Sequence, residues 1–450
     1  MIDVREEISS APIGRYHIVL AVLVGLVVFF DGYDTFNPAY VIHYVAKPWH
    51  LAPGQAGWLV SSGLIGFMIG SVLQGKFSDR YGRRATLLGA LWIVTILSFL
   101  TAALGRSFLT FCFLRGLTGL GMGALLPLGV TYVNEYAPRR LANTFSMWGW
   151  SLGWAAGGIV AAAIGIYLTP AFGWQALYYA ASLSIVLVLI CHLALPESLQ
   201  FSAMRGDWQE IACTLSRLIP SRADLYAVPG ETFTFNEPND RRASVSLLLS
   251  PCYRRTTLSV WVAAFFILFG IWGLSGWVPT AMMQRGEGFA TSFGFGALIQ
   301  VMAFIGGLLC GYLADHAGRD REAMAVWWLG GALSVGTLAL FNVHVLNVIC
   351  VGAAGFCILG GQNVLNNFTA ASYDTEVRGT GVGMMLGVGR AGGILGPYVT
   401  GLLQQHTPGT AGLFAAIGAA SLIGGAAIVF ASPRPSREAV PAGTRAIHAA

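Results

Sequence analysis

Charged residues are scarce in this sequence. Only 10% of its 450 residues are Asp, Glu, Lys or Arg, whereas soluble globular domains carry roughly a quarter. Hydrophobic residues make up 55%. They gather in runs of about 20 residues, the length that an α-helix needs to cross the hydrocarbon core of a bilayer. The chain is therefore not a soluble globular protein, and we expect many membrane-spanning helices.

Patterns that would indicate a metal site, a disulfide framework or a nucleic-acid partner are also missing. The seven cysteines are scattered without C-x-x-C spacing, so we interpret them as small apolar core residues. The eight histidines show no metal-ligand clustering. The net charge of +5 comes from basic residues in short loops between apolar runs, which is not a nucleic-acid signature. We expect no cofactor, no metal and no bound nucleic acid.

Twelve apolar segments follow one another, six on each side of a polar central stretch. They lie at about 16–40, 54–75, 85–105, 107–134, 143–168, 174–195, 256–283, 291–315, 323–343, 344–369, 376–406 and 411–432. We expect an all-α integral membrane protein whose chain divides into four parts. These are a six-helix bundle at 1–195, a cytoplasmic central loop at 196–255, a second six-helix bundle at 256–432 and a cytoplasmic tail at 433–450.

The distribution of basic residues predicts the orientation of the chain in the membrane, and composition predicts the character of the N-terminal tail and the central loop. Only Lys47, Arg106 and Arg285 lie in loops on one side, so the positive-inside rule places both termini in the cytoplasm. We expect residues 1–15 to form a polar tail. The central loop is rich in Pro, Asn and Asp, so we expect a flexible tether with amphipathic stretches on the membrane surface.

A polar motif separates the second and third apolar segments. It reads Gly75-Lys-Phe-Ser-Asp79-Arg80-Tyr-Gly82-Arg83-Arg84. Gly75 would let a helix end pack closely against its neighbour, and Asp79 would accept from the next helix or pair with a guanidinium. A basic loop that only sets orientation is the simpler alternative. The return of the acid in a second copy favours a loop that latches two helices in one state and releases them in another.

The second half of the chain repeats the first. Gly311, Asp315 and Arg319 match the first motif at the same offset that relates the stretches at Gly153 and Gly389. A constant offset indicates an internal duplication. Further candidates for the cytoplasmic latch lie at the inner ends of the fourth and eleventh segments. They are Glu135, Arg139 and Arg378.

Two carboxylates lie inside the first apolar segment. Burying an ionisable group in a membrane span costs free energy, so such residues usually have a function. Asp31 and Asp34 share one helix face, and two close carboxylates favour one of them holding a proton near neutral pH. We expect them to carry the coupling proton, with Asp31 the first choice. The alternative is that both are solvated at the outer mouth or cap a helix broken at Pro38.

Two arginines also lie inside predicted spans. Arg115 is in the outer half of the fourth segment, from which it would reach the acids of the first, either in proton coupling or in a fixed structural ion pair. Arg390 is near the middle of the eleventh segment, among glycines, and its counterpart in the first half is Trp154. A guanidinium facing an aromatic ring suggests a site for an aromatic anion, although a structural ion pair is the alternative.

Four further residues are candidates for the lining of that site. Tyr33 and Phe36 offer aromatic rings, although packing or an interfacial belt would explain rings equally well. Asn363 and Asn367 in the tenth segment either line the cavity or bond across helices.

These motifs carry a family resemblance that spans nearly the whole chain. The pattern G-x-x-x-D-R-x-G-R-R between two spans resembles the cytoplasmic loop motif of the major facilitator superfamily. Three further stretches are similar to the aromatic acid:proton symporters. They are Asp31-Gly-Tyr-Asp34-Thr, Arg115-Gly-Leu-Thr-Gly-Leu-Gly-Met-Gly and Gly-Arg390-Ala-Gly-Gly-x-x-Gly-Pro397. The resemblance implies coupling roles for Asp31 and Asp34 and functional roles for Arg378 and Arg390.

The resemblance implies a symporter that imports benzoate, a hydroxybenzoate or a related aromatic carboxylate with protons, by alternating access. It also implies a bacterial inner-membrane location, and we expect a monomer. A symporter of another organic anion, such as muconate or nicotinate, is an alternative. A proton-driven drug exporter is disfavoured because the fifth segment lacks the Gly-Pro pair of antiporters. An enzyme is disfavoured because no nucleophile–base or metal-ligand constellation appears.

Overall fold

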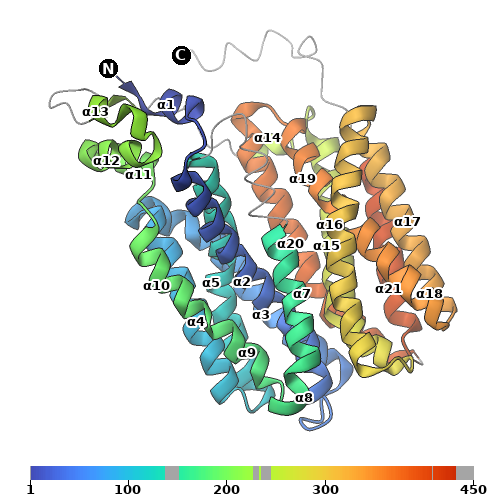
Figure 1. Cartoon of the computed structure of the whole chain (residues 1–450). Coiled ribbons are helices and arrows are strands. Elements are labelled where there is room, and N and C mark those ends of the chain that lie inside the picture. Colours follow the sequence, from blue (N-terminus) through green and yellow to red (C-terminus); the bar gives the residue numbers. More distant parts are fainter. Residues whose placement is uncertain (1, 137–151, 227–232, 235–244, 408, 432–450) are drawn as a thin grey trace. The chain divides into compact units, whose positions relative to one another are not determined.

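The structure is a computed structural model that describes residues 2–136, 152–226, 233–234, 245–407 and 409–431. It consists almost entirely of helices (Figure 1). Its contacts group the chain into two compact units. Unit 1 comprises Met1–Pro238, Ser275–Phe304 and Pro397–Thr410, and unit 2 comprises Asn239–Leu274, Ile305–Gly396 and Ala411–Ala450. Helices that bridge these ranges contribute residues to both units.

The first half of the chain supplies the elements before the central loop. In order they are β1 (Ile2–Asp3), α1 (Val4–Ser10), α2 (Arg15–Val45), α3 (Pro53–Tyr81), α4 (Arg83–Leu104), α5 (Phe108–Tyr136), α7 (Gly153–Tyr167), α8 (Thr169–Phe172), α9 (Gln175–Ser182) and α10 (Ser184–Ala194). The central loop follows with α11 (Leu199–Arg205), α12 (Trp208–Leu218), η2 (Pro220–Arg222), α13 (Ala223–Tyr226), β2 (Phe233–Thr234) and α14 (Val245–Leu248).

The second half continues with long helices. They are α15 (Arg254–Gln284), α16 (Phe289–Ala317), α17 (Asp320–Leu340), α18 (His344–Ala354), the π-helix η3 (Gly355–Leu359), α19 (Gly361–Ser372), α20 (Thr375–His406) and α21 (Ala411–Val429). The short π-helix joins α18 and α19 into one apolar run; such turns inside α-helices often mark functional segments.

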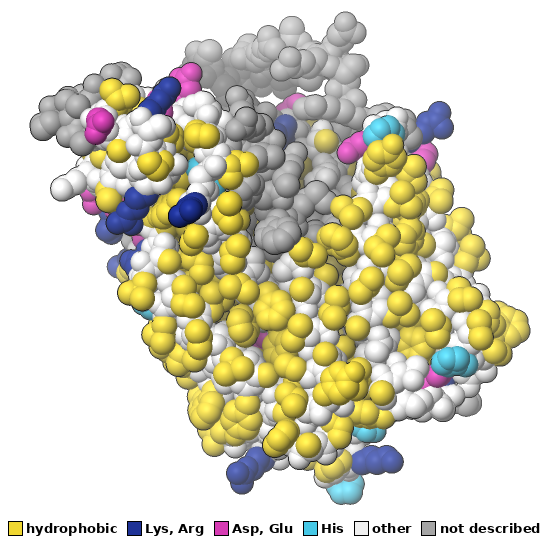
Figure 2. Space-filling model, in the orientation of Figure 1, with side chains coloured by type: hydrophobic (Ala, Val, Ile, Leu, Met, Phe, Trp, Pro, Cys, Tyr) yellow, Lys and Arg dark blue, Asp and Glu magenta, His cyan; other side chains and the backbone are white. Residues whose placement is uncertain are grey.

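The described residues contain ten helices that are long and apolar enough to cross a membrane. Two further helices, α7 and α20, fall where the fifth and eleventh apolar segments were predicted. Figure 2 shows apolar side chains over the visible flanks of the long helices, with charged side chains gathered toward helix ends. This distribution suits helices that present their flanks to lipid. The predicted all-α, multi-span architecture is confirmed.

Glycine allows the closest helix packing in unit 1, between α3 and α5. A Cβ at Gly66 would collide with the carbonyl oxygen of Gly116, and one at Gly119 would collide with that of Gly63. Backbones can approach this closely in lipid only where side chains are absent. The glycine-rich stretch after Arg115 therefore holds α5 against α3, and so fixes the depth of the arginine in the bundle.

The N-terminal tail and residues 199–226 and 233–234 of the central loop form one folded module in unit 1, which corrects the prediction of a polar tail and a flexible tether for these residues. β1 pairs in parallel with β2, and α1 lies beside α11–α13 (Figure 1). Val4 and Ile8 of α1 share a buried cluster with one face of α12, which carries Ile211, Leu215 and Leu218. The amphipathic stretch predicted at Trp208 is confirmed as helix α12, and its apolar face is covered by protein.

Polar contacts close the same module. Glu7 accepts from Arg222 at 2.7 Å and from the Tyr226 hydroxyl at 2.7 Å. Burial raises the pKa of the Tyr226 phenol, and the Glu7 carboxylate raises it further, so the phenol stays protonated as the donor. Asp3 caps α1 by accepting from the backbone N–H of Arg5 at 2.9 Å.

Candidate functional site

A fully buried ion pair joins α2 to α5. Arg115 Nη1 donates to Asp34 Oδ2 at 2.6 Å, and Arg115 Nη2 donates to the Asp34 carbonyl oxygen at 3.1 Å. The Asp34 side chain is 0% exposed and that of Arg115 is 2% exposed. Ser98 of α4 donates to Asp34 Oδ1 at 3.2 Å, and the Arg115 guanidinium lies over the Tyr178 ring, 5.4 Å from its centre. The contact expected from the sequence is therefore present at Asp34.

Asp31 lies one turn before Asp34 on the same helix and is also completely buried. The helix α2 continues through Pro38 to Val45 without a break. These findings exclude the alternative in which both acids are solvated at an outer mouth or cap a broken helix. Two carboxylates and one arginine thus lie inside unit 1, where charge is costly unless it is paired or has a function.

Two further polar groups of α2 tie it to α9. Tyr33 donates its hydroxyl to the carbonyl oxygen of Leu177 at 2.8 Å, and Asn37 Nδ2 donates to the same oxygen at 3.4 Å. Tyr33 is therefore a buried structural contact of α2 with α9, with its hydroxyl directed at backbone. Its predicted role in lining a substrate site stays a prediction.

An aromatic and amide cluster lies where α2, α7 and α16 meet in unit 1. The rings of Phe36 and Trp154 pack edge to face, with centres 5.9 Å apart and planes at 83°. A Cβ at Gly158 of α7 would lie 2.6 Å from Gln300 Nε2 and 2.9 Å from the Phe36 ring. Gln300 is 4% exposed, and its Nε2 has no hydrogen-bond partner among the described residues. The close approach of Gln300 to α7 depends on glycine at 158.

The site residues predicted in the second half lie in unit 2. Arg390 is half-buried on α20, whose glycines pack closely on α15: a Cβ at Gly392 would collide with the Phe265 carbonyl oxygen. Asn363 of α19 is half-buried, and its Nδ2 would lie 3.1 Å from a Cβ at Gly307 of α16. Asn367 is exposed.

A polar network at the predicted cytoplasmic end of unit 1 joins α4, α5 and the segment after α10. Arg83 pairs with Glu135, and Ser198 donates to Glu135 Oε2 at 2.6 Å. Glu197 Oε1 accepts from the backbone N–H of Arg84 at 2.9 Å, at the start of α4. A carboxylate at a helix N-terminus is stabilised by the unpaired N–H groups there. Arg83, Arg84 and Glu135, predicted as latch residues, thus meet in one network.

Other predicted latch residues are placed differently. Asp79 and Arg80 are exposed on the last turns of α3, and Arg80 lies over the Tyr81 ring. The close packing predicted at Gly75 is wrong for the described part of the chain, because no atom there lies within 4 Å of a Cβ at this position. Arg139 lies outside the described residues.

The second copy of the motif lies in unit 2. Asp315 and Arg319 are exposed at the junction of α16 and α17, and Arg378 is half-buried in the second turn of α20. Nearby, Tyr253 donates to Asp374 Oδ2 at 2.5 Å, just before α20 begins. These positions are compatible with a second latch, whose action stays a prediction.

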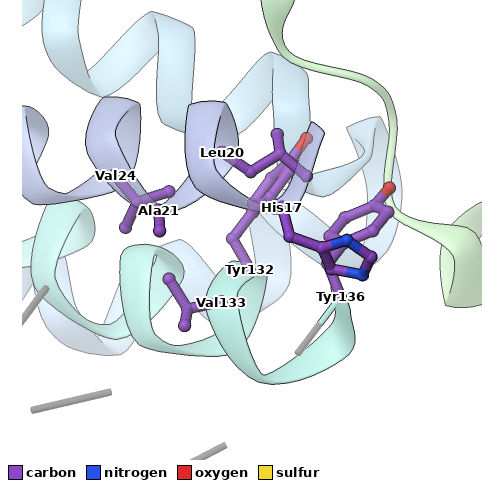
Figure 3. Close-up of a pocket in the computed structure, with 7 residues that line it drawn as sticks. All are labelled: His17, Leu20, Ala21, Val24, Tyr132, Val133 and Tyr136. Atoms are coloured by element: carbon purple, nitrogen blue, oxygen red, sulfur yellow. The ribbon is translucent and has the colours of Figure 1, made fainter. Parts of the chain in front are cut away.

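A small pocket lies near the start of α2 (Figure 3). It is lined by His17, Leu20, Ala21, Val24, Tyr132, Val133 and Tyr136. Its volume of about 10 Å³ is near the lower limit for holding one water molecule. His17 Nδ1 accepts from the Gly14 backbone N–H at 3.2 Å, so this ring fixes the first turn of α2. The pocket is too small for an organic substrate.

Gln300, Ser98 and the capping role of Glu197 were not predicted from the sequence. Gln300 is the one amide side chain in the apolar run of α16. Ser98 is one of four hydroxyl side chains on α4, and it is distinguished from the others only by its hydrogen bond to Asp34. A search for isolated amides inside apolar spans would have found Gln300, whereas the role of Ser98 required the fold.

Comparisons with known proteins agree with this architecture. A gallate transporter from Pseudomonas putida is 33% identical over 423 residues, which cover 93% of this chain and 92% of that protein. A benzoate transport protein from Acinetobacter baylyi is 29% identical over 90% of this chain and 88% of its own length. Among solved structures, the inward open xylose transporter XylE from E. coli superposes with a TM-score of 0.74 at 15% identity. That match covers 94% of this chain and 98% of XylE.

The sequence also matches the family described as Major Facilitator Superfamily, over residues 22–343 and 300–449. The match includes the buried pair of α2 and α5 and the aromatic cluster with Gln300. Family, relatives and fold agree that the protein is a multi-pass membrane transporter and not an enzyme. The chain belongs to the Major Facilitator Superfamily.

Proposed function

We propose that the protein is a proton-coupled symporter that imports an aromatic carboxylate across the bacterial inner membrane by alternating access. The observation that carries the proposal is the buried pair of Asp34 and Arg115, next to the buried Asp31. Transport of aromatic acids is the named activity of the gallate and benzoate relatives, which match nearly the whole chain.

Proton coupling needs a carboxylate that exchanges a proton while the transporter changes state. Protonation of Asp34 would remove the charge that Arg115 neutralises, leaving the guanidinium to seek another anion. Asp31, one turn earlier on α2, is such an anion. A change of partner at Arg115 would alter the contact of α2 with α5, and symport requires that substrate binding favour the same change.

We assign anion binding to Arg390 of unit 2 and ring stacking to Trp154 of unit 1, each within its own unit. A guanidinium binds a carboxylate through two parallel hydrogen bonds, and a tryptophan offers stacking to an aromatic ring. Arg390 is half-buried on α20, and Trp154 is half-buried on α7, so each has part of its surface accessible to a ligand. The network around Arg83 would open and close as the protein changes state, and the second motif at Asp315 would act in the same way in unit 2.

Uptake by proteoliposomes tests the proposal. Labelled 4-hydroxybenzoate is supplied outside, with and without a pH gradient that is acid outside. We expect accumulation that requires the gradient and that a protonophore abolishes. Absence of uptake with every aromatic acid tried, or movement of substrate outward as protons enter, would overturn symport of aromatic acids.

Arg390→Lys tests the anion site. Lysine keeps the charge but cannot form the paired hydrogen bonds of a guanidinium, so we expect uptake to fall about 10-fold or more while the folded protein persists. Arg285→Lys is the matched control, because Arg285 donates to Thr410 Oγ1 at the end of α15. Unaltered uptake in Arg390→Lys removes the anion-site assignment.

A further inference from the structure

The amide of Gln300 is an unsatisfied donor in the membrane-spanning part of unit 1. It is 4% exposed, and its Nε2 has no partner among the described residues. A buried amide without a hydrogen bond is destabilising, and the bilayer core supplies no water in compensation. Such a group persists where something binds it for part of the working cycle.

Three residues on one face of α16, Gln300 among them, pack against α2 and α7. Phe293, Gly296 and Gln300 recur along one face of α16, at the spacing that aligns side chains on a helix. Phe293 packs on the Tyr40 ring with centres 4.9 Å apart, and a Cβ at Gly296 would meet Tyr40. The amide position is therefore set by a rigid helix face.

The immediate neighbours of the amide are aromatic and apolar. A methyl group at Gly158 would lie 2.6 Å from Nε2, and the same glycine borders Phe36. Trp154 lies one turn before Gly158 on α7 and packs edge to face against Phe36. An aromatic ring bound in this cluster would contact two rings and present its substituents to a single fixed donor.

We propose that Gln300 recognises a ring hydroxyl of the substrate, so that the transporter prefers hydroxylated aromatic acids to benzoate. This inference rests on the proposed function. Nε2–H donates to the phenolic oxygen, while Phe36 and Trp154 hold the ring. A site built to bond a hydroxyl discriminates against the analogue without it, because its buried amide is then left unpaired.

The neutrality of the cluster favours a ring hydroxyl over the carboxylate. Its side chains Phe36, Trp154 and Gln300 carry no charge, and the buried cation of unit 1, Arg115, is bonded to Asp34. A carboxylate placed among them would lose its hydration without gaining a cation. A phenolic hydroxyl needs only one or two neutral hydrogen bonds, which an amide supplies.

The test compares Gln300→Leu with the wild type in proteoliposomes, using labelled 4-hydroxybenzoate and labelled benzoate. We expect kcat/KM for 4-hydroxybenzoate to fall about 10- to 100-fold, and that for benzoate to change less than about 3-fold. Gln300→Asn keeps an amide but withdraws it by one methylene, and we expect an intermediate loss confined to 4-hydroxybenzoate. Gln404→Leu is the matched control, because Gln404 Nε2 is also unpartnered but lies in the last turn of α20.

The outcomes separate this inference from the proposed function. If the wild type takes up neither acid, the proposed function fails before any variant is compared. If both acids lose uptake equally in Gln300→Leu while the protein remains folded, the amide does not read the ring hydroxyl and the inference is overturned. Retention of full discrimination in Gln300→Leu overturns it as well.

Discussion

At the scale of single residues, the buried charges of Asp34 and Arg115 in unit 1 are stabilised by hydrogen bonds and by each other. Asp34 accepts from Arg115 and from Ser98, and Arg115 also bonds to backbone and lies over an aromatic ring. Removing one partner of such a pair leaves the other as an uncompensated buried charge. The two residues are therefore coupled in stability, whatever role either has in transport.

A double-mutant cycle measures this coupling. Arg115→Ala alone is expected to destabilise the protein by about 3–5 kcal/mol, because the Asp34 carboxylate loses its counter-ion. Asp34→Leu combined with Arg115→Met is expected to recover most of that loss. Thermal unfolding in detergent is the measurement. Equal loss in the single and double variants would mean that the pair is not the source of the stability.

The same pair predicts a loss of proton coupling in addition to the loss of stability. Asp34→Asn removes the carboxylate that we propose exchanges a proton, so we expect gradient-driven accumulation to fall about 10-fold or more. Exchange of labelled for unlabelled substrate at equal pH is expected to fall less, since it needs no net proton movement. Asp224→Asn, in the exposed part of α13, is the control for the same chemical change. Accumulation that survives Asp34→Asn would transfer the coupling role to Asp31.

The residue types of the site were readable from the sequence, but their partners were not. Ionisable residues in apolar runs stand out because they are costly there, so Asp31, Asp34 and Arg115 were found. Whether Arg115 pairs with Asp31 or with Asp34 depends on how α2 and α5 are rotated about their own axes. That rotation cannot be deduced from one sequence. Gln300 was not predicted because a neutral amide costs less in a membrane span than a charged group does. It is nevertheless a lone amide in the apolar run of α16, and the sequence shows this.

At the scale of helices, close packing depends on where glycine faces a backbone. Gly66 and Gly75 both lie on α3, yet only Gly66 meets the backbone of α5 among the described residues. Composition does not distinguish the two glycines. Close packing was predicted at Gly75 because it belongs to a motif, whereas Gly66 belongs to none of the motifs considered. The position of each glycine on the helix surface, and not its number, determines its contribution.

This difference gives a paired prediction. Gly66→Ala is expected to lower stability by about 1–3 kcal/mol, because its methyl group forces α3 away from α5. Gly75→Ala is expected to leave stability unchanged or to raise it slightly, since alanine is the better helix former. Thermal unfolding of the two variants is compared under identical conditions. Equal destabilisation of both would contradict the assigned packing of α3 on α5.

The module formed by the N-terminal tail and α11–α13 shows that tertiary contacts can outweigh composition. Residues 1–15 and the central loop appear polar, but every third or fourth residue of α1 and α12 is apolar, and these faces cover each other. Neither segment has a partner close to it along the chain, so the sequence predicted a polar tail and a flexible tether with amphipathic stretches on the membrane surface. The helix at Trp208 was predicted correctly, and its burial was not.

Substitution in α1 tests this module. Val4→Asp places a charge at a fully buried position, so we expect α1 to detach and trypsin to cleave at Arg205 or Arg217 more rapidly. Ser10→Asp adds the same charge at an exposed position and is expected to leave cleavage unchanged. Equal cleavage in Val4→Asp and the wild type would mean that α1 does not protect the central loop.

At the scale of the whole molecule, the architecture followed from the spacing of apolar runs and from the repeated motifs. Runs of membrane-spanning length predicted the long helices, and the constant offset between motifs predicted two related halves, because both features survive changes in individual side chains. The boundary between the halves as separate bundles stays a prediction. The substrate was not encoded in any motif, because ring substituents are recognised by walls built from several helices.

The most direct measurement of proton-coupled symport follows the internal pH of proteoliposomes when an aromatic acid is added outside. A pH-sensitive dye is trapped inside, and labelled 4-hydroxybenzoate is added at neutral external pH. We predict acidification of the lumen that parallels substrate entry, exceeds that in protein-free liposomes and disappears in Asp34→Asn. Substrate entry without a change in internal pH, or alkalinisation of the lumen, would contradict symport.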